Sequence, residues 1–436
     1  MTVQIFCAAT QYAAATVTAA IRSGLFGPRS KHRRILVVSD TSAVPELGTP
    51  LDRMSGFEAL RPEFDEVRSW NATIHPHHPA GWSPRAQDVP LWEKSLRLAW
   101  GLGDDKVEIA CESIQANPSR AVAAIFADSP LHVYADGLMS YGPTRNQIPL
   151  PMSSRISRLI HLDLVPGLRP MLLSEYGVEP VAVPDAQFRA VLGEIGSAAE
   201  IGPERPTALL LGQYLSALEL ISRDEEEELH LGMIRGAAAL GHRVITFKPH
   251  PSAPADSTRA LEELGTSLGL DLHILRTPVL AETLYERARP ELVVGCFSTA
   301  MITAAAFYSI PAARVGTELL LERITPYQNS NRVPLTIVDA LVPDLTDTGR
   351  AGGPVDLTAD VGGLVRAVGY CMQSGSHPGL REEAASFLSS LPEERLTRYF
   401  KRRRLTSLGL PGATPPVRGE ALRRNPVLRK VARRMR

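Results

Sequence analysis

The sequence predicts an α/β protein with two Rossmann-like domains whose parallel sheets face a central cleft. A length of 436 residues exceeds one ordinary core and suggests two. In both halves, short apolar runs alternate with amphipathic segments, as in parallel doubly wound sheets. A Gly/Pro-rich stretch at 202–206 separates the halves. We therefore expect an N-terminal domain over 1–200, a C-terminal domain over 206–375, a terminal helix over 381–404 and a basic tail over 405–436.

Apolar runs in the first half predict strands that alternate with helices. The first strand leads through Thr10 into an alanine-rich helix that Gly24 ends. Residues 155–200 carry a weak pattern that indicates helix in part. The expected strands of this half are 3–8, 35–38, 107–111 and 131–134.

The second half has the clearer pattern. Ser222 and Glu225 form a capping box that predicts a helix from there to about Leu240. Further helices are expected over 257–268 and 280–288, with another from Ser298 to Phe307. The expected strands are 208–211, the run that begins at Val244, 272–275, 292–295 and 312–315.

Composition excludes several classes of protein. A hydrophobic share of 44% and a charged share of 22% are typical of a globular chain. The four cysteines are widely spaced and form no CxxC or Cys/His cluster, so neither a metal site nor a disulfide framework is predicted. No apolar run reaches the length of a spanning helix and no signal peptide is evident, which predicts a cytoplasmic protein.

The formal net charge of zero conceals an uneven distribution. From Arg398 to the end there are thirteen Lys or Arg residues and one acid, Glu420, while the rest of the chain carries the compensating negative charge. Apolar residues alternate with arginines in the last run, which favours an anionic membrane surface as partner. An anionic polysaccharide ranks second, nucleic acid is unlikely without a binding module, and a solvated tail is the alternative.

Four polar features follow predicted strands, where ligands bind in open parallel sheets. They are Asp136 with Gly137, Lys248 with His250 in a Lys-Pro-His-Pro turn, Glu282, and Ser298 with Thr299. The sequence has no GxGxxG motif and no P-loop, so the usual dinucleotide and NTPase sites lack their signature.

Each feature has a chemical and a plain structural interpretation. Hydroxyls at a helix start suit a phosphate, but Ser298 and Thr299 are also ordinary capping residues. Glu282 could accept ribose hydroxyls or face solvent. His250 could stabilise a departing phosphate with Lys248 adding charge, or sit in a rigid turn. Asp136 could act as a general base or form an Asp-Gly turn.

The motifs carry a family resemblance when taken in order. They are Tyr134-Ala135-Asp136-Gly137, Lys248-Pro249-His250-Pro251, Leu280-Ala281-Glu282 and Phe297-Ser298-Thr299-Ala300. This set resembles the bacterial α-2,8-polysialyltransferase-like family of bacterial sialyltransferases, over about residues 1–320. The resemblance implies a GT-B fold with an acceptor-side N-terminal domain and a CMP-sugar-binding C-terminal domain.

The resemblance also implies the reaction and its residues. Sialic acid would pass from CMP-sialic acid to a hydroxyl of a cell-surface glycan or glycolipid precursor by inverting displacement, with no metal or other cofactor, at the inner face of the membrane. Asp136 would be the base and His250 would assist the departure of CMP. Ser298 and Thr299 would hold the CMP phosphate and Glu282 the ribose. Lys248, Pro251 and Gly212 are further candidates for nucleotide binding at the same strand ends.

The first acidic position of the family motif is Ala135 here, so one carboxylate of the acidic pair is missing. Two alternatives to a sialyltransferase remain open. One is a GT-B enzyme that uses another nucleotide sugar, as transferase or epimerase. The other is a membrane-peripheral binding protein with a decayed site.

Overall fold

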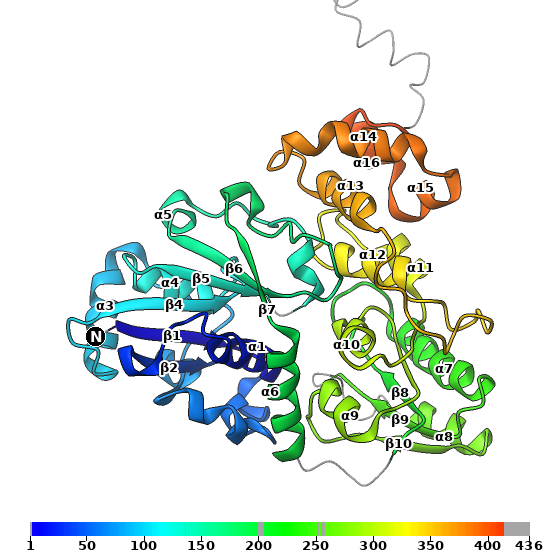
Figure 1. Ribbon diagram of the computed structural model, residues 1–436, viewed down its shortest axis with the longest axis horizontal. Helices are drawn as coiled ribbons and strands as arrows, with labels where there is room; N and C mark the ends of the chain where they lie inside the picture. The colour runs from blue at the N-terminus through cyan, green and yellow to red at the C-terminus, as the bar shows by residue number, and fades with distance from the viewer. Residues whose placement is uncertain (1, 136, 199–204, 251–252, 254–257, 414–436) are drawn as a thin grey trace, which may run out of the picture.

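Two parallel sheets organise the chain (Figure 1). The computed structural model describes residues 2–135, 137–198, 205–250, 253 and 258–413. The first half forms a seven-stranded sheet of order β3-β2-β1-β4-β5-β6-β7, and the second half forms a five-stranded sheet of order β10-β9-β8-β11-β12. Every pairing between these strands is parallel.

The four strands predicted in the first half are confirmed, with small extensions. Strand β3 was not among them. Two further strands, β6 and β7, lie in the region whose pattern indicated only partial helix, so that expectation was incomplete. Strand β7 has four residues, begins with a proline and lies at the sheet edge, where the alternation signal is weakest. The strands are β1 (Thr2–Ala8), β2 (His32–Val38), β3 (Glu66–Ser69), β4 (Lys106–Glu112), β5 (Leu131–Ala135), β6 (Ile156–Leu162) and β7 (Pro180–Val183).

Helices cover both faces of this sheet, which is why its central strands are apolar on both sides. Alternate residues of β1 enter separate cores: Phe6 belongs to one and Ile5 to the other. The helices are α1 (Gln11–Arg22), α2 (Trp70–Ile74), α3 (Val89–Ala99), α4 (Ser119–Ile125), α5 (Leu150–Ser153) and α6 (Asp185–Ala198).

The second sheet repeats the alternation on a smaller scale, and its predicted strands are confirmed. The capping box at the start of α7 is also confirmed: Ser222 Oγ accepts from Glu225 N at 3.1 Å, and the Glu225 carboxylate accepts from Ser222 N at 2.9 Å. The elements are β8 (Ala208–Leu211), α7 (Arg223–Ala239), β9 (Val244–Lys248), α8 (Arg259–Ser267), β10 (Asp271–Ile274), α9 (Ala281–Ala288), β11 (Leu292–Gly295), α10 (Thr299–Tyr308) and β12 (Ala312–Arg314).

Helices of the first half pack directly on helices of the second. Helix α6 contacts both α1 and α9, and Figure 1 shows it between the two sheets. The Phe188 ring of α6 lies 5.2 Å from the Tyr12 ring and 5.8 Å from that of Phe307. The Tyr12 hydroxyl lies 3.3 Å from Thr303 Oγ1 on α10. The largest hydrophobic core is therefore continuous across the two halves.

The elements that the structure describes after β12 are helices, and the expected single helix over 381–404 is wrong. Pro392, which lacks an amide proton, separates α14 from α15, and Phe400 and Lys401 are extended before α16. Leu405 and Leu410 are buried, so the packed body extends beyond residue 404. The helices are α11 (Thr317–Arg323), α12 (Arg332–Leu341), α13 (Gly362–Met372), α14 (Arg381–Ser390), α15 (Glu393–Tyr399) and α16 (Arg402–Leu408).

A buried carboxylate, Asp339 of α12, ties together α11, α12 and α15 of this helical region, and it lies 3.4 Å from Arg314 at the end of β12. It accepts two bonds of 2.7 Å from Arg398, one of 2.8 Å from the Tyr399 hydroxyl and one of 2.5 Å from Thr317. Burial by itself would raise the pKa of Asp339. The bonds from Arg398 and the charge of Arg314 outweigh burial and hold the pKa below its ordinary value.

Other features of the described residues bear on the setting. All four cysteines are free thiols in the interior. Within the described ranges, no helix is both long and apolar enough to cross a membrane.

Replacing Asp339 with alanine should destabilise the chain by about 3 kcal/mol, because it leaves Arg398 and the Tyr399 hydroxyl without their acceptor. Urea unfolding at pH 7 measures this. Because the folded pKa is lowered, the contribution of Asp339 is present above its unfolded pKa and lost as pH falls through the folded one, so the difference should shrink below about pH 4. Glu383→Ala, which removes only a surface pair with Arg366, is the control and should change stability by less than about 0.5 kcal/mol. Equal effects of the two changes would contradict the interpretation.

Candidate active site

Three adjacent strands of the second sheet deliver the nucleotide-site candidates to one edge. The order β9-β8-β11 places their carboxyl ends side by side. Lys248 ends β9, Gly212 follows β8, and Ser298 lies three residues after β11. The parallel topology therefore brings together residues that are far apart in sequence.

Gly212 allows β8 and β9 to approach closely. A Cβ on this residue would lie 2.7 Å from the Phe247 ring and 3.3 Å from the Lys248 carbonyl. Its amide donates to that carbonyl at 2.9 Å. Gly212 therefore shapes the floor of the site, and its N–H is already used within the protein.

Gln213 is a site residue that sequence reasoning missed. Its side-chain oxygen accepts from the Phe297 amide at 2.8 Å and so ties the loop after β8 to the loop after β11. Its position directly after a predicted strand could have pointed to this residue. A glutamine, however, is neither charged nor nucleophilic, so its residue type did not single it out.

Lys248 and Glu282 form the charged part of the site. Burial lowers the pKa of Lys248, and the negative charge of Glu282 opposes this shift. Glu282, in the first turn of α9, is only 3% exposed. A solvent-facing glutamate is thereby excluded, since this carboxylate is held inside the protein near a cation.

His250 follows β9, and much of its surface is accessible to solvent. Desolvation of its ring lowers its pKa, the charge of Lys248 lowers it further, and Glu226 acts in the opposite direction. The imidazole is therefore neutral at pH 7 and carries one N–H that can donate.

Glu226 of α7 is a second residue that the sequence did not single out. It is buried, and its carboxylate accepts from the Leu215 amide and, at 2.6 Å, from the Ser216 hydroxyl. It thus fixes the loop after β8 and adds negative charge near His250. Within the acidic stretch Asp224–Glu228 nothing marked this residue as the one that turns inward.

Ser298 is the N-cap of α10. Its hydroxyl accepts from the Ala300 amide at 3.3 Å and its carbonyl from the Met301 amide at 3.1 Å. With the Phe297 amide bound to Gln213, three amides near this turn already have partners. A phosphate here would meet the two hydroxyls and the positive end of α10, not an open nest of amides.

The Asp136–Gly137 motif meets the Ser298–Thr299 motif across the two halves. A Cβ on Gly137 would lie 2.8 Å from the Thr299 hydroxyl, and the Leu138 amide donates to that hydroxyl at 3.4 Å. Asp136 and Pro251 lie outside the described residues. The residues on both sides of Asp136 are described, and Gly137 lies against the start of α10.

In the part of the chain that the structure describes, no group of three or more His, Cys, Asp or Glu side chains could hold a metal ion.

Comparisons with known proteins give the family. Residues 4–317, well over half of the chain, match the family model described as alpha-2,8-polysialyltransferase. No curated protein matches significantly.

Distant similarities exist among solved structures. The GT-B domain of a sialyltransferase from Photobacterium damselae is 13% identical, with 78% of this chain and 96% of that chain covered and a TM-score of 0.40. UDP-GlcNAc 2-epimerase from Neisseria meningitidis is 11% identical, with coverages of 72% and 82% and a TM-score of 0.42. MurG from Acinetobacter baumannii is 10% identical, with coverages of 79% and 85% and a TM-score of 0.39.

Two parallel sheets with polar motifs at their strand ends and a family model over most of the chain define a glycosyltransferase of the GT-B type. The chain belongs to the alpha-2,8-polysialyltransferase family.

Gly137→Ala should lower kcat about 100-fold, because the new methyl group would push the loop after β5 away from Thr299 and misplace groups across the site. Steady-state kinetics measure the effect, and the affinity for the nucleotide of the donor should change little. Gly142→Ala is the matched control, since its Cβ would meet Met139 and Val333 at an ordinary 3.5 Å. A fully active Gly137→Ala variant would show that the close approach is not needed.

Proposed function

We propose that the protein transfers sialic acid from CMP-sialic acid to a hydroxyl group of a cell-surface glycan precursor. The observation that carries the proposal is the contact of Gly137 and Leu138 with Thr299. It joins the motif that holds the candidate base, in the first half, to the motif that holds the candidate phosphate ligands, in the second.

Donor binding is assigned to the strand ends of the second sheet. The Ser298 and Thr299 hydroxyls and the positive end of α10 receive the CMP phosphate. The Glu282 carboxylate accepts hydrogen bonds from the ribose, and Lys248 adds positive charge beside it. Gly212 and Pro251 shape the surface on which the nucleotide lies.

The transfer itself is a single displacement with inversion. Asp136 takes the proton from the acceptor hydroxyl as its oxygen attacks the anomeric carbon. The bond from that carbon to the CMP phosphate oxygen breaks, and the N–H of His250 stabilises the negative charge that develops on the phosphate. No step in this scheme calls on a metal ion or another cofactor.

A donor screen tests the proposal against its alternatives. Calorimetry with CMP, UDP and CDP should show binding of CMP in preference to the others. Preference for UDP would favour another nucleotide-sugar enzyme. If no nucleotide binds, the remaining alternative is a membrane-peripheral binding protein with a decayed site.

Asp136→Ala should abolish transfer to acceptor and leave the CMP dissociation constant unchanged, because a base that faces the acceptor contributes little to donor binding. Product formation from labelled CMP-sialic acid and calorimetry with CMP report the two quantities separately. Parallel loss of turnover and CMP affinity would overturn the assignment.

His250 should make CMP binding depend on pH. Its pKa is lowered in the free protein, and a bound phosphate raises it, so binding takes up a proton. The affinity ratio of wild type to His250→Ala should therefore grow as pH falls below 7, by up to about tenfold for each pH unit between the free and bound pKa values. Titration of the CMP phosphate affects both proteins alike and cancels from the ratio.

His242→Ala, before the amino end of β9, is the control and should keep the wild-type pH profile of CMP affinity. An affinity ratio of wild type to His250→Ala that does not change with pH would contradict the role proposed for His250.

The proposed reaction also places the protein beside an anionic membrane surface. Residues 414–436 carry eight basic side chains and one acid, Glu420, and lie outside the described residues. Attraction of such a segment to anionic lipid follows from its charge. Peripheral association at the cytoplasmic face is therefore part of the proposal.

Removing residues 414–436 should release the protein from vesicles that contain phosphatidylserine at low salt, because electrostatic attraction to the surface is lost. Co-sedimentation measures this. The cut spares Leu405 and Leu410, which belong to the packed body, so CMP binding by the truncated chain serves as the control. Undiminished sedimentation would remove the membrane from the proposal.

A further inference from the structure

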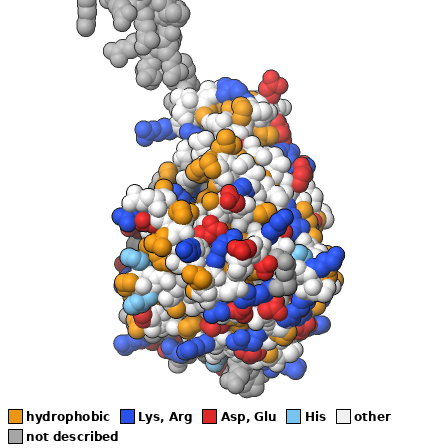
Figure 2. All heavy atoms as spheres, turned by 90° about the vertical axis from the view of Figure 1, so that its left-hand side faces the viewer, with side chains coloured by type: hydrophobic (Ala, Val, Ile, Leu, Met, Phe, Trp, Pro, Cys, Tyr) orange, Lys and Arg blue, Asp and Glu red, His pale blue; other side chains and the backbone are white. Residues whose placement is uncertain are grey.

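A pocket of about 410 Å³ opens at the amino ends of the strands of the first sheet, away from the motifs described above. Figure 2 shows the side of the first half on which the amino end of β1 lies, and there Lys and Arg side chains lie beside Asp and Glu side chains. The volume falls within the roughly 300–1,000 Å³ of small-molecule sites. The pocket is therefore large enough for a ligand of that kind.

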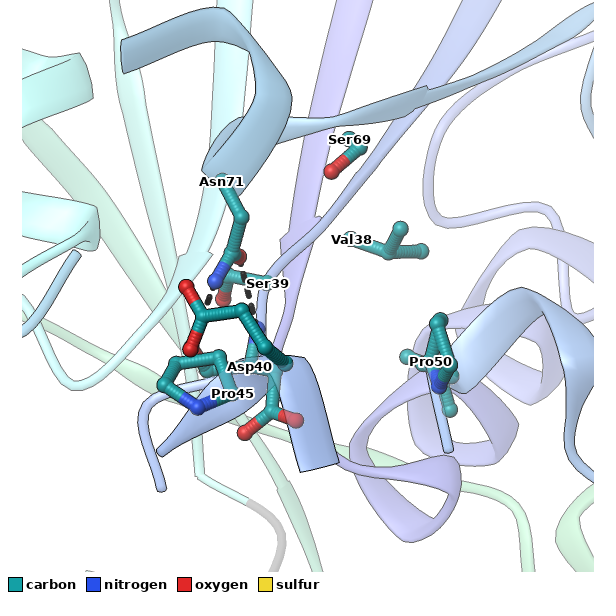
Figure 3. A pocket seen from close by; sticks show the side chains of 9 residues that line it. Val38, Ser39, Asp40, Pro45, Pro50, Ser69 and Asn71 are labelled. Carbon is teal, nitrogen blue, oxygen red and sulfur yellow. Dashed lines mark hydrogen bonds between the residues drawn. The ribbon is translucent and has the colours of Figure 1, made fainter. Parts of the chain in front are cut away.

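A smaller cavity, of about 160 Å³, lies at the carboxyl ends of β2 and β3 (Figure 3). Its side chain Asn71 bonds both ways to the backbone of Asp40: the Asp40 amide donates to Oδ1 at 2.9 Å, and Nδ2 donates to the Asp40 carbonyl at 2.9 Å. This cavity opens at the sheet edge that carries the transfer motifs and is part of that region. The pocket at the amino ends is separate from it.

A band of polar residues crosses the sheet at the pocket. Strands β2, β1 and β4 place Arg34, Gln4 and Glu108 in direct register, and β5 and β6 place His132 opposite Arg158 on the same face. Central strands of a parallel sheet that is covered on both faces are normally apolar throughout, because burial of polar groups costs free energy. Polar residues on five neighbouring strands indicate a site that the sheet is built to hold.

Hydrogen bonds fix the floor of the pocket. Gln4 is 3% exposed, and its Nε2 donates to the Phe26 carbonyl at 3.0 Å and to Glu108 Oε2 at 3.1 Å. The buried Arg34 donates to Gln4 Oε1 at 3.4 Å and to the Gly27 carbonyl at 2.7 Å. This network holds the loop after α1 and the Glu108 carboxylate in place, so the pocket is formed before a ligand arrives.

The hydrogen bonds of His132 define its tautomer. Its Nδ1 accepts from Arg158 Nε at 3.1 Å, and a guanidinium can only donate. Burial, and next the charge of Arg158, lower the pKa of His132 to about 4, while Glu108 acts in the opposite direction. The ring is therefore neutral at pH 7, and its single proton is on Nε2, which is a donor.

Three groups at the pocket have hydrogen-bonding capacity left. Besides its bond to His132, Arg158 donates from Nη2 to the Leu25 carbonyl at 2.6 Å. Among the described residues, no partner is found for Arg158 Nη1, His132 Nε2 or Glu108 Oε1. The negative charge of Glu108 acts on Arg158, yet the two side chains form no ion pair within the described ranges. A ligand that accepts from Arg158 and His132 and donates to Glu108 would complete all three groups.

The chemistry of these groups selects the ligand. A guanidinium and an imidazole N–H suit a carboxylate, and the Glu108 carboxylate accepts from hydroxyl groups. Leu25 and Phe26 add an apolar wall that suits the C–H groups of a sugar ring. We infer that this pocket is a second ligand site, which binds a small sugar acid through its carboxylate and hydroxyl groups.

The second site is distinct from the transfer site. His132 and Ala135 are three residues apart on β5, so roughly 10 Å of strand separates the pocket from the carboxyl edge of the sheet. A molecule in the pocket takes no part in the displacement at that edge. The inference goes beyond the proposed function, which enters only in the choice of free sialic acid as the probe.

Binding of free N-acetylneuraminic acid to the full chain tests the inference. Calorimetry at pH 7, with CMP in excess to occupy the proposed donor site, should show one site. Arg158→Met should lower the affinity about tenfold or more, because a charge-assisted hydrogen bond is lost. His132→Phe, which keeps a ring edge-to-face with Phe26, should lower it about fivefold, because a neutral donor is lost. Arg169→Met, which removes an exposed arginine paired with Glu179, is the control and should bind like wild type.

Two comparison probes test which groups the pocket reads. N-acetylmannosamine lacks the carboxylate, and L-serine would place an ammonium group on Glu108; both should bind at least about tenfold more weakly than N-acetylneuraminic acid. Equal or tighter binding of either probe would overturn the inference, as would no binding of the sugar acid or wild-type affinity in both Arg158→Met and His132→Phe. Thermal unfolding reports whether each variant is folded, and if Arg158→Met is not, His132→Phe decides. A protein that binds no CMP would refute the proposed function and leave this test, repeated without CMP, intact.

Discussion

The close approach of Gly137 to Thr299 is the contact on which the site depends. A side chain at position 137 would collide with Thr299 unless one of them moved. The backbone of the first half therefore directly meets the Thr299 hydroxyl of the second half. Around it, α6 packs on α9 and Tyr12 reaches Thr303, so the separation of the two sheets is set by buried contacts. Two motifs 161 residues apart thereby share one place.

Electrostatics gives this junction its chemical character. Lys248 and Glu282 each would be costly to bury alone, and their proximity offsets part of that cost. Loss of either charge would leave the other one buried without its partner. The electrostatic balance of the pair therefore depends on any further charge that binds beside it. A phosphate bound here, as proposed, would add a negative charge next to Lys248 and His250 and would favour the protonated form of both side chains.

Much of the architecture could be predicted from sequence because strand and helix signals agreed with one another. The strands at 208–211 and 292–295 coincide with β8 and β11, and Ser222 with Glu225 marked the start of α7. Strands β6 and β7 were not predicted. Polar residues Ser157, Arg158 and His161 interrupt the apolar run of β6, and β7 is a short edge strand. The division of the terminal helix into three was not predicted, because the apolar pattern continues across the breaks at Pro392 and at the extended residues Phe400 and Lys401.

The candidate site divides in the same way. Residues with distinctive chemistry, such as His250 and Glu282, could be singled out by type and position. Gln213 and Glu226 could not, because their importance lies in which amide or hydroxyl they contact. The cavity at the ends of β2 and β3 also required the fold, since Asp40 and Asn71 become neighbours only when the two strands pair.

The alanine at position 135, where the resemblance implies an acid, is explained by its surroundings. Ala135 pairs with His161 of β6, and paired residues of parallel strands project to the same face. His161 is 6% exposed, and burial lowers its pKa, so the ring is neutral. A carboxylate at 135 would lie beside a buried neutral imidazole, and its charge would have to be neutralised or paired at a cost in stability. Alanine packs at this position without that cost, against the second core. The substitution is therefore accounted for by the packing of β5 on β6, and it is not in itself a sign that the neighbouring carboxylate has lost its use.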